Sequence, residues 1–247
     1  MNISGSGHIG AGEYNESISV SGSGKLDGNV RCIGLHCSGS VRGAGSVDCS
    51  EDISVSGSCH IEKCASAKSV KASGSMRVGG DLTAGEEIKA SGSLDCGGSL
   101  KCAMLKCSGS TEVGGEIEAD EVHISGKIVC TGLLNAEKID ISFGKTFGPS
   151  KIGSIGGSEI KIHNESSRGA NHSSRMPLFS RLVGSSGRGL TVGELIEGDT
   201  VAIECVSAPR VVGRVVAIGA GCEIDLVQYS DKIEIHPDAK IGNVEKI

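Results

Sequence analysis

The tripeptide Ser-Gly-Ser recurs along the first half of the chain at a nearly constant interval. Copies begin at Ser4, Ser21, Ser38, Ser56, Ser73, Ser91 and Ser108, and a degenerate copy, Ser-Gly-Lys, begins at Ser125. Successive copies are 17 or 18 residues apart. A fixed period of this length arises when one structural unit is stacked on itself, so the repeat predicts a solenoid.

Each tripeptide follows a large apolar residue, a polar residue and a smaller apolar residue, as in Ile53-Ser-Val55. A spacing of two places both apolar residues on the same side of a strand. Such pairs recur about every six residues, so three fit into one period, as with Val70/Ala72, Met76/Val78 and Leu82/Ala84. The pattern predicts an all-β chain that forms a single-stranded parallel β-helix with triangular coils of 17–18 residues.

The order aliphatic-x-small departs from the small-x-aliphatic order of left-handed hexapeptide helices. Together with the general right-handed rule for parallel crossovers, it favours a right-handed coil. Glycines at the expected corners, such as Gly74, Gly92 and Gly109, are expected to supply backbone angles that other residues adopt with difficulty. A helical chain is disfavoured, because nothing repeats at 3.6 residues and 39 of the 247 residues are glycine.

The repeat predicts three segments: a β-helix over residues 1–164, a basic and apolar flexible loop over 165–189, and further β-helix coils over 190–247. The loop is rich in Ser and Gly and carries four arginines against Glu165 alone. Pro177 suits the first turn of a short helix that would place apolar residues on one face. We expect membrane or partner contact from Met176, Leu178, Phe179, Arg181, Leu182 and Val183. Packing along the solenoid, or an inert linker, remains open for this segment.

Composition narrows the classes of function. A net charge of −6 argues against nucleic acid as a partner. No stretch resembles a signal peptide or a membrane span, and we expect a cytoplasmic protein. No Ser/His/Asp grouping and no phosphate-binding loop of known spacing occurs, so the sequence predicts neither an enzyme nor a nucleotide or other cofactor.

The chain has 11 cysteines. Many fall on the small inward position of the repeat: Cys37, Cys96, Cys102, Cys107 and Cys130. A free cysteine there acts as a small hydrophobic residue and indicates a reducing compartment. Metal binding and disulfide or redox chemistry are the alternatives, although no Cys-x-x-Cys motif is present.

The Ser-Gly-Ser repeat, the glycine corners and the C-terminal stretches Ile196–Val201, Val212–Asp225 and Val227–Ser230 resemble the bactofilins, which are bacterial polymer-forming cytoskeletal proteins. The resemblance implies a right-handed β-helix that assembles end to end into filaments without nucleotide. It also implies a scaffold for cell shape, envelope or motility machinery, with self or a paralogous chain as partner. Members of that family often carry a membrane anchor in an N-terminal tail. Here the repeat begins at residue 1, so the anchoring role of a tail cannot be carried over to this chain. At most, we expect the 165–189 loop to contact the anionic inner surface of the cell membrane.

Solenoid ends need polar caps to stay soluble, and the ends of this repeat carry apolar residues instead. We expect the polymer contacts at Met1, Ile3, Ile241, Val244 and Ile247. Two other classes remain: a hexapeptide-type acyltransferase-like enzyme, which would need a trimer with a histidine at a cleft between subunits, and a β-solenoid surface or binding protein, which would need export.

Overall fold

The computed structural model describes residues 1–143, 149–164 and 189–247. Among these residues the regular structure is entirely β, and the parallel strands stack as a β-solenoid of about 13 turns. The predicted all-β parallel β-helix is therefore confirmed. The chain forms two compact units, Met1–Ala119 and Asp120–Ile247, which are described in turn.

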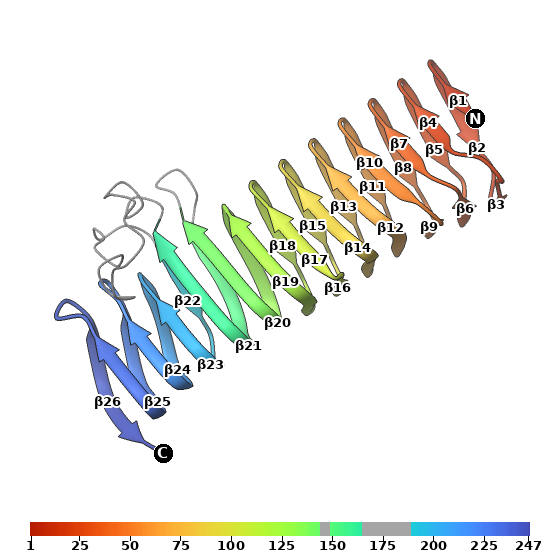
Figure 1. Ribbon diagram of the computed structural model, residues 1–247. Coiled ribbons are helices and arrows are strands. Elements are labelled where there is room, and N and C mark those ends of the chain that lie inside the picture. The colour runs from red at the N-terminus through yellow and green to blue at the C-terminus, as the bar shows by residue number, and fades with distance from the viewer. Residues whose placement is uncertain (144–148, 165–188) are drawn as a thin grey trace, which may run out of the picture. The chain divides into compact units, whose positions relative to one another are not determined.

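The first unit has three ladders of parallel strands, which we call faces 1, 2 and 3 (Figure 1). Face 1 consists of β1 (Asn2–Ile3), β4 (Ile18–Val20), β7 (Leu35–Cys37), β10 (Asp52–Val55), the second halves of β12 (Ala65–Ala72) and β14 (Leu82–Ala90), and β17 (Met104–Cys107). Face 2 consists of β2 (Ser6–Ile9), β5 (Ser23–Leu26), β8 (Ser40–Gly43), β11 (Ser58–Ile61), β13 (Ser75–Val78), β15 (Ser93–Cys96) and β18 (Ser110–Val113). Face 3 consists of β3 (Gly12–Glu13), β6 (Val30–Cys32), β9 (Val47–Cys49), the first halves of β12 and β14, β16 (Leu100–Lys101) and the start of β19 (Ile117–Ser125).

Each residue of a face pairs with the residue 17 or 18 positions further on, as Asn2 does with Ser19 and His36 with Ser54. This register places equivalent inward residues directly above one another. On face 1 the large inward position forms a buried column, in which every side chain is at most 1% exposed: Ile18, Leu35, Ile53, Val70, Ile88 and Leu105. Burial of each such side chain contributes about 1.5–3 kcal/mol, so stacking, not any single coil, creates the core.

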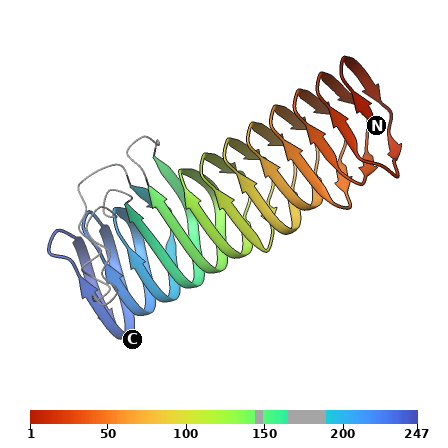
Figure 2. The same cartoon turned by 45° about the horizontal axis from the view of Figure 1, so that its top comes forward.

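The Ser-Gly-Ser tripeptide forms the corner between faces 1 and 2. Figure 2 shows the successive coils of the first unit, and their corners, from a second direction. The parallel backbone pairing continues around this corner: Ser56 N–H donates to the carbonyl of Cys37 at 2.8 Å, and Ser58 N–H donates to that of Gly39 at 2.9 Å. Because the glycine carbonyl points along the stack, a Cβ on Gly57 would lie 1.9 Å from the Gly39 oxygen. The glycine is required by this close approach.

The same close approach recurs at Gly22, Gly39, Gly74, Gly92 and Gly109, where a Cβ would lie 2.0–2.1 Å from the glycine oxygen one coil earlier. The expectation that these corner glycines supply unusual backbone angles is wrong. Among the described glycines, a positive φ is found at Gly12 and Gly221, neither of which belongs to the tripeptide.

Most strands of the second unit are longer than those of the first and continue from one face to the next. After β19, its strands are β20 (Lys127–Phe143), β21 (Ser150–Asn164), β22 (Leu190–Val192), β23 (Leu195–Ile203), β24 (Val206–Ile218), β25 (Glu223–Ile235) and β26 (Lys240–Lys246). Strand β21 pairs in parallel with β22 and β23, matching Ile160 with Val201 and Ile162 with Ile203. Residues 190–247 thus extend the ladder begun by β20 and β21.

Replacing Gly57 with alanine should lower the free energy of unfolding by about 2 kcal/mol, because the added methyl group meets a backbone carbonyl that no rotamer change can avoid. Gly85→Ala is the matched control, since the nearest atom to its Cβ would be 3.9 Å away. Its effect should stay within about 0.5 kcal/mol. Urea denaturation of both variants measures the difference, and equal losses would contradict the stacking explanation.

Candidate functional site

The predicted polymer contacts lie in the first turn of the first unit and the last turn of the second. Met1 is 39% exposed, and Ile3 is half-buried at the end of β1. Ile241 is half-buried in β26, whereas Val244 and Ile247 are 42% and 64% exposed. Among the described residues β26 pairs on one side alone, with β25, so its other edge carries unpaired backbone N–H and C=O groups. Such an edge is a template for another strand.

One residue of the last turn was missed by sequence reasoning. Ile235 pairs in register with Ile218 on one side, but β26 ends before it can cover the other side. Ile235 is therefore 40% exposed. The sequence shows that Ile235 belongs to the apolar pair Ile233/Ile235. Its exposure depends on the point at which β26 stops pairing with β25, which the sequence pattern does not show.

A second surface, also missed by sequence reasoning, flanks the Ser-Gly-Ser corner of the first unit. The outward positions next to this corner form one column on each face. The face 1 column is Asn2, Ser19, His36, Ser54, Lys71, Lys89 and Lys106, and the face 2 column is His8, Lys25, Arg42, His60, Arg77, Asp95 and Glu112. Up to Lys89 neither column contains an acidic residue. We call the two columns, with the exposed serines between them, the cationic edge.

Some cations of this edge have acidic neighbours within the first unit. Lys25 pairs with Asp27 at 3.2 Å, Arg77 with Asp95 at 2.8 Å and Lys106 with Glu87 at 3.1 Å. In the described part of the chain no hydrogen bond or ion pair engages the side chains of four others: Arg42, His60, Lys71 and Lys89. In the sequence they are marked by basic residues that recur at the 17–18-residue period, as Lys71, Lys89 and Lys106 do.

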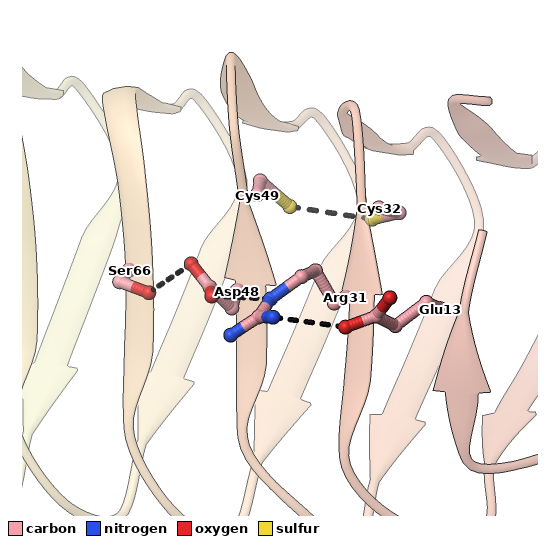
Figure 3. A network of polar contacts seen from close by, with 6 residues as sticks. All are labelled: Glu13, Arg31, Cys32, Asp48, Cys49 and Ser66. Carbon is pink, nitrogen blue, oxygen red and sulfur yellow. Dashed lines mark hydrogen bonds and ion pairs between the residues drawn. The ribbon is translucent and has the colours of Figure 1, made fainter. Parts of the chain in front are cut away.

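Face 3 differs from the cationic edge, because its outward charges alternate in sign from coil to coil (Figure 3). Arg31 Nη1 contacts Glu13 Oε1 at 2.9 Å, and Arg31 Nε contacts Asp48 Oδ2 at 3.0 Å. The hydroxyl of Ser66 donates to Asp48 Oδ1 at 2.7 Å. Charges of alternating sign on successive turns therefore neutralise each other along this ladder.

The contrast between faces has an energetic consequence. Neighbouring coils are about 4.8 Å apart, and like charges directly opposite each other across strands are destabilising. The chain relieves this repulsion by pairing on face 3 but leaves it in place where Lys71 and Lys89 are register partners on face 1. An external anion would lower the free energy of these side chains, which makes the cationic edge a candidate binding surface.

The cysteines lie mainly in the interior, as their positions in the repeat predict. All 11 are free thiols, and Cys64 is the exposed one. Burial raises the pKa of Cys59 to about 12 and that of Cys96 to about 11, so these thiols stay protonated. No group of three His, Cys, Asp or Glu residues within the described ranges could hold a metal ion.

Two further observations concern the membrane. The predicted contact residues Met176, Leu178, Phe179, Arg181, Leu182 and Val183 lie outside the described residues, as does nearly all of the 165–189 segment. Where the structure is described, it has no helix long and apolar enough to cross a bilayer.

Asp48→Asn should cost up to about 1 kcal/mol at pH 7, because it removes the charge that holds Arg31 and Ser66. The Ser66 hydroxyl, followed by Arg31, lowers the pKa of Asp48 in the folded state from its usual 3.8. This stabilisation is therefore complete above pH 3.8 and is lost as the pH falls through the lower folded pKa. The difference between wild type and variant should shrink in acid, as measured by urea denaturation from pH 7 to pH 2.

Glu51→Gln is the control for that measurement. Glu51 is exposed, and its side chain has no partner among the described residues. Its removal should leave both the stability and its pH dependence unchanged. A pH-independent loss in Asp48→Asn would show that the carboxylate charge is not what stabilises the ladder.

A stretch of 116 residues is 32% identical to the uncharacterized protein YhbF of Bacillus subtilis (strain 168). It covers 47% of this chain and 42% of that protein, so the chain spans less than half the length of this relative. No family model and no solved structure matches the chain. This relative is itself uncharacterized, so the functional site is inferred from the geometry described above.

Proposed function

We propose that this chain is a non-enzymatic cytoskeletal scaffold that assembles end to end into filaments without nucleotide. The observation that carries the proposal is the combination, in the terminal turns, of exposed apolar side chains with an unpaired strand edge. Val244, Ile247 and Ile235 are exposed at one of these turns, and Met1 is exposed at the other. Stacking on another copy would bury these side chains and continue the parallel ladder at the spacing of about 4.8 Å that operates within each unit.

The resemblance to bactofilins supports the same proposal, because members of that family polymerise through a β-helix of this kind. We place the scaffold in the cytoplasm, where buried free thiols are stable, and assign it to cell-shape, envelope or motility machinery. Its partners would be further copies of itself or a paralogous chain.

We further propose that the filament lies on an anionic membrane surface through the cationic edge. Long Lys and Arg side chains on the two sides of a convex corner can reach a flat surface together, and each contributes about 1 kcal/mol near anionic lipid. One chain would bind weakly through a few such residues, whereas a polymer repeats the edge in every subunit and binds by avidity.

Val244→Glu and Ile3→Glu should each abolish filaments, because a charge placed in a stacking contact would be buried without a partner. Ile33→Glu is the matched control. Ile33 is about as exposed as Val244, at 40%, but it lies on the surface between β6 and β7, away from the terminal turns. Negative-stain electron microscopy without nucleotide distinguishes these outcomes, with circular dichroism to confirm folding. Unchanged filaments from both terminal variants would refute the assignment of the contacts.

Vesicle binding tests the cationic edge. The double variant Arg42→Glu/Lys89→Glu should bind phosphatidylserine vesicles at least about tenfold more weakly than wild type. The control Lys63→Glu/Lys101→Glu makes the same change in net charge away from the edge and should bind like wild type. Equal weakening in both variants would mean that net charge alone governs binding. Phe179→Asp/Leu182→Asp, on the same vesicles, measures the part played by the 165–189 segment.

A further inference from the structure

Two cysteines of the first unit face each other across neighbouring coils. Cys32 ends β6 and Cys49 ends β9, and the two residues are register partners in the parallel ladder of face 3. Their sulfur atoms lie 3.4 Å apart in the interior, and each side chain is 3% exposed. Figure 3 shows the two sulfurs directed toward each other between the strands.

The same two strands are held in register from outside. Arg31 and Asp48, the residues immediately before the two cysteines, form the 3.0 Å ion pair of the face 3 ladder. Alternation along a strand puts the ion pair outward and the sulfurs inward. The outer pair therefore maintains the alignment that keeps the sulfurs opposite each other.

Other inward cysteines of the first unit lack such a neighbour. Cys37 has Val20 and Val55 as its register partners, and Cys59 has Val41 and Met76. In later coils the position of Cys32 and Cys49 is taken by Ala67, Ala84, Cys102 and Ala119, so that Cys102 has alanine as its equivalent on each side. The Cys32–Cys49 pair is thus a departure from the filler role that cysteine has elsewhere in the repeat.

We infer that Cys32 and Cys49 form a redox pair that closes to a cross-coil disulfide when the folded chain meets a low-molecular-weight disulfide such as oxidised glutathione. Neighbouring strands about 4.8 Å apart place their Cα atoms within the range that a disulfide spans, so the bond needs little backbone movement. It would join β6 to β9 covalently and resist separation of these coils.

The chemistry balances by thiol–disulfide exchange. The Cys32 thiolate attacks one sulfur of oxidised glutathione, forming a mixed disulfide and releasing one glutathione thiolate, which takes up a proton. The Cys49 sulfur then attacks the Cys32 sulfur, and the second glutathione leaves with the proton that the Cys49 thiol gives up. Two protein thiols lose two hydrogen atoms, and one oxidised glutathione is reduced to two molecules of glutathione. The hydrogen bond from the Cys49 thiol lowers the pKa of Cys32, which suits Cys32 to make the first attack.

The experiment uses the full chain with Cys64→Ser, which removes the exposed thiol. The reduced, folded protein is incubated with oxidised glutathione, free thiols are alkylated, and peptides are mapped by mass spectrometry without reduction. A peptide pair linked through Cys32 and Cys49 is expected. The melting temperature should rise by about 5 °C and return to its original value on reduction.

Two further variants make the result specific. Cys32→Ala in the same background should abolish the linked peptide and the thermal shift, and should fold because alanine occupies this position in later coils. Cys37→Ala, an equally buried cysteine without a register-matched thiol, should leave both unchanged. The inference is overturned if the folded chain keeps both thiols free while the urea-unfolded chain oxidises, or if either cysteine links to a different one.

Discussion

The in-register pairing of each coil with the next is the interaction on which the rest of this structure depends. It sets the period, because each residue stacks on its equivalent in the next coil only when every coil contains 17 or 18 residues. It also requires glycine at the Ser-Gly-Ser corner, where the carbonyl of one glycine occupies the space that the Cβ of the next would need. The apolar columns of the core follow from the same register.

Stacking also decides what happens to charge and to thiols. Outward residues of successive coils are close neighbours, so a charged outer column can be an alternating ladder, as on face 3, or a line of like charges, as Lys71 and Lys89 are on the cationic edge. Inward residues are equally close, which brings the sulfurs of Cys32 and Cys49 to 3.4 Å. A single geometric rule thus yields a neutralised face, a charged edge and a candidate redox pair.

Assembly is the natural extension of this rule beyond one chain. Within each unit a coil is stabilised by the coils on both sides, whereas the terminal turns have a neighbour on one side among the described residues. Their exposed residues Met1, Val244 and Ile247 are what an interior coil would bury. The proposed filament therefore needs no new type of contact, and the proposed membrane contact uses a surface that stacking leaves free.

The sequence alone determined the β-helix, its period and its three faces, because period and alternation are local properties that a linear pattern records directly. It also located the apolar residues of the terminal turns. The reason for the corner glycines was misjudged, since the clash is with a carbonyl from the preceding coil. Three features were decided by tertiary structure: the exposure of Ile235, the lack of ion-pair partners at Arg42, Lys71 and Lys89 of the cationic edge, and the meeting of Cys32 with Cys49. Each of these depends on which coils lie side by side and where pairing stops, and both are properties of the stacked chain.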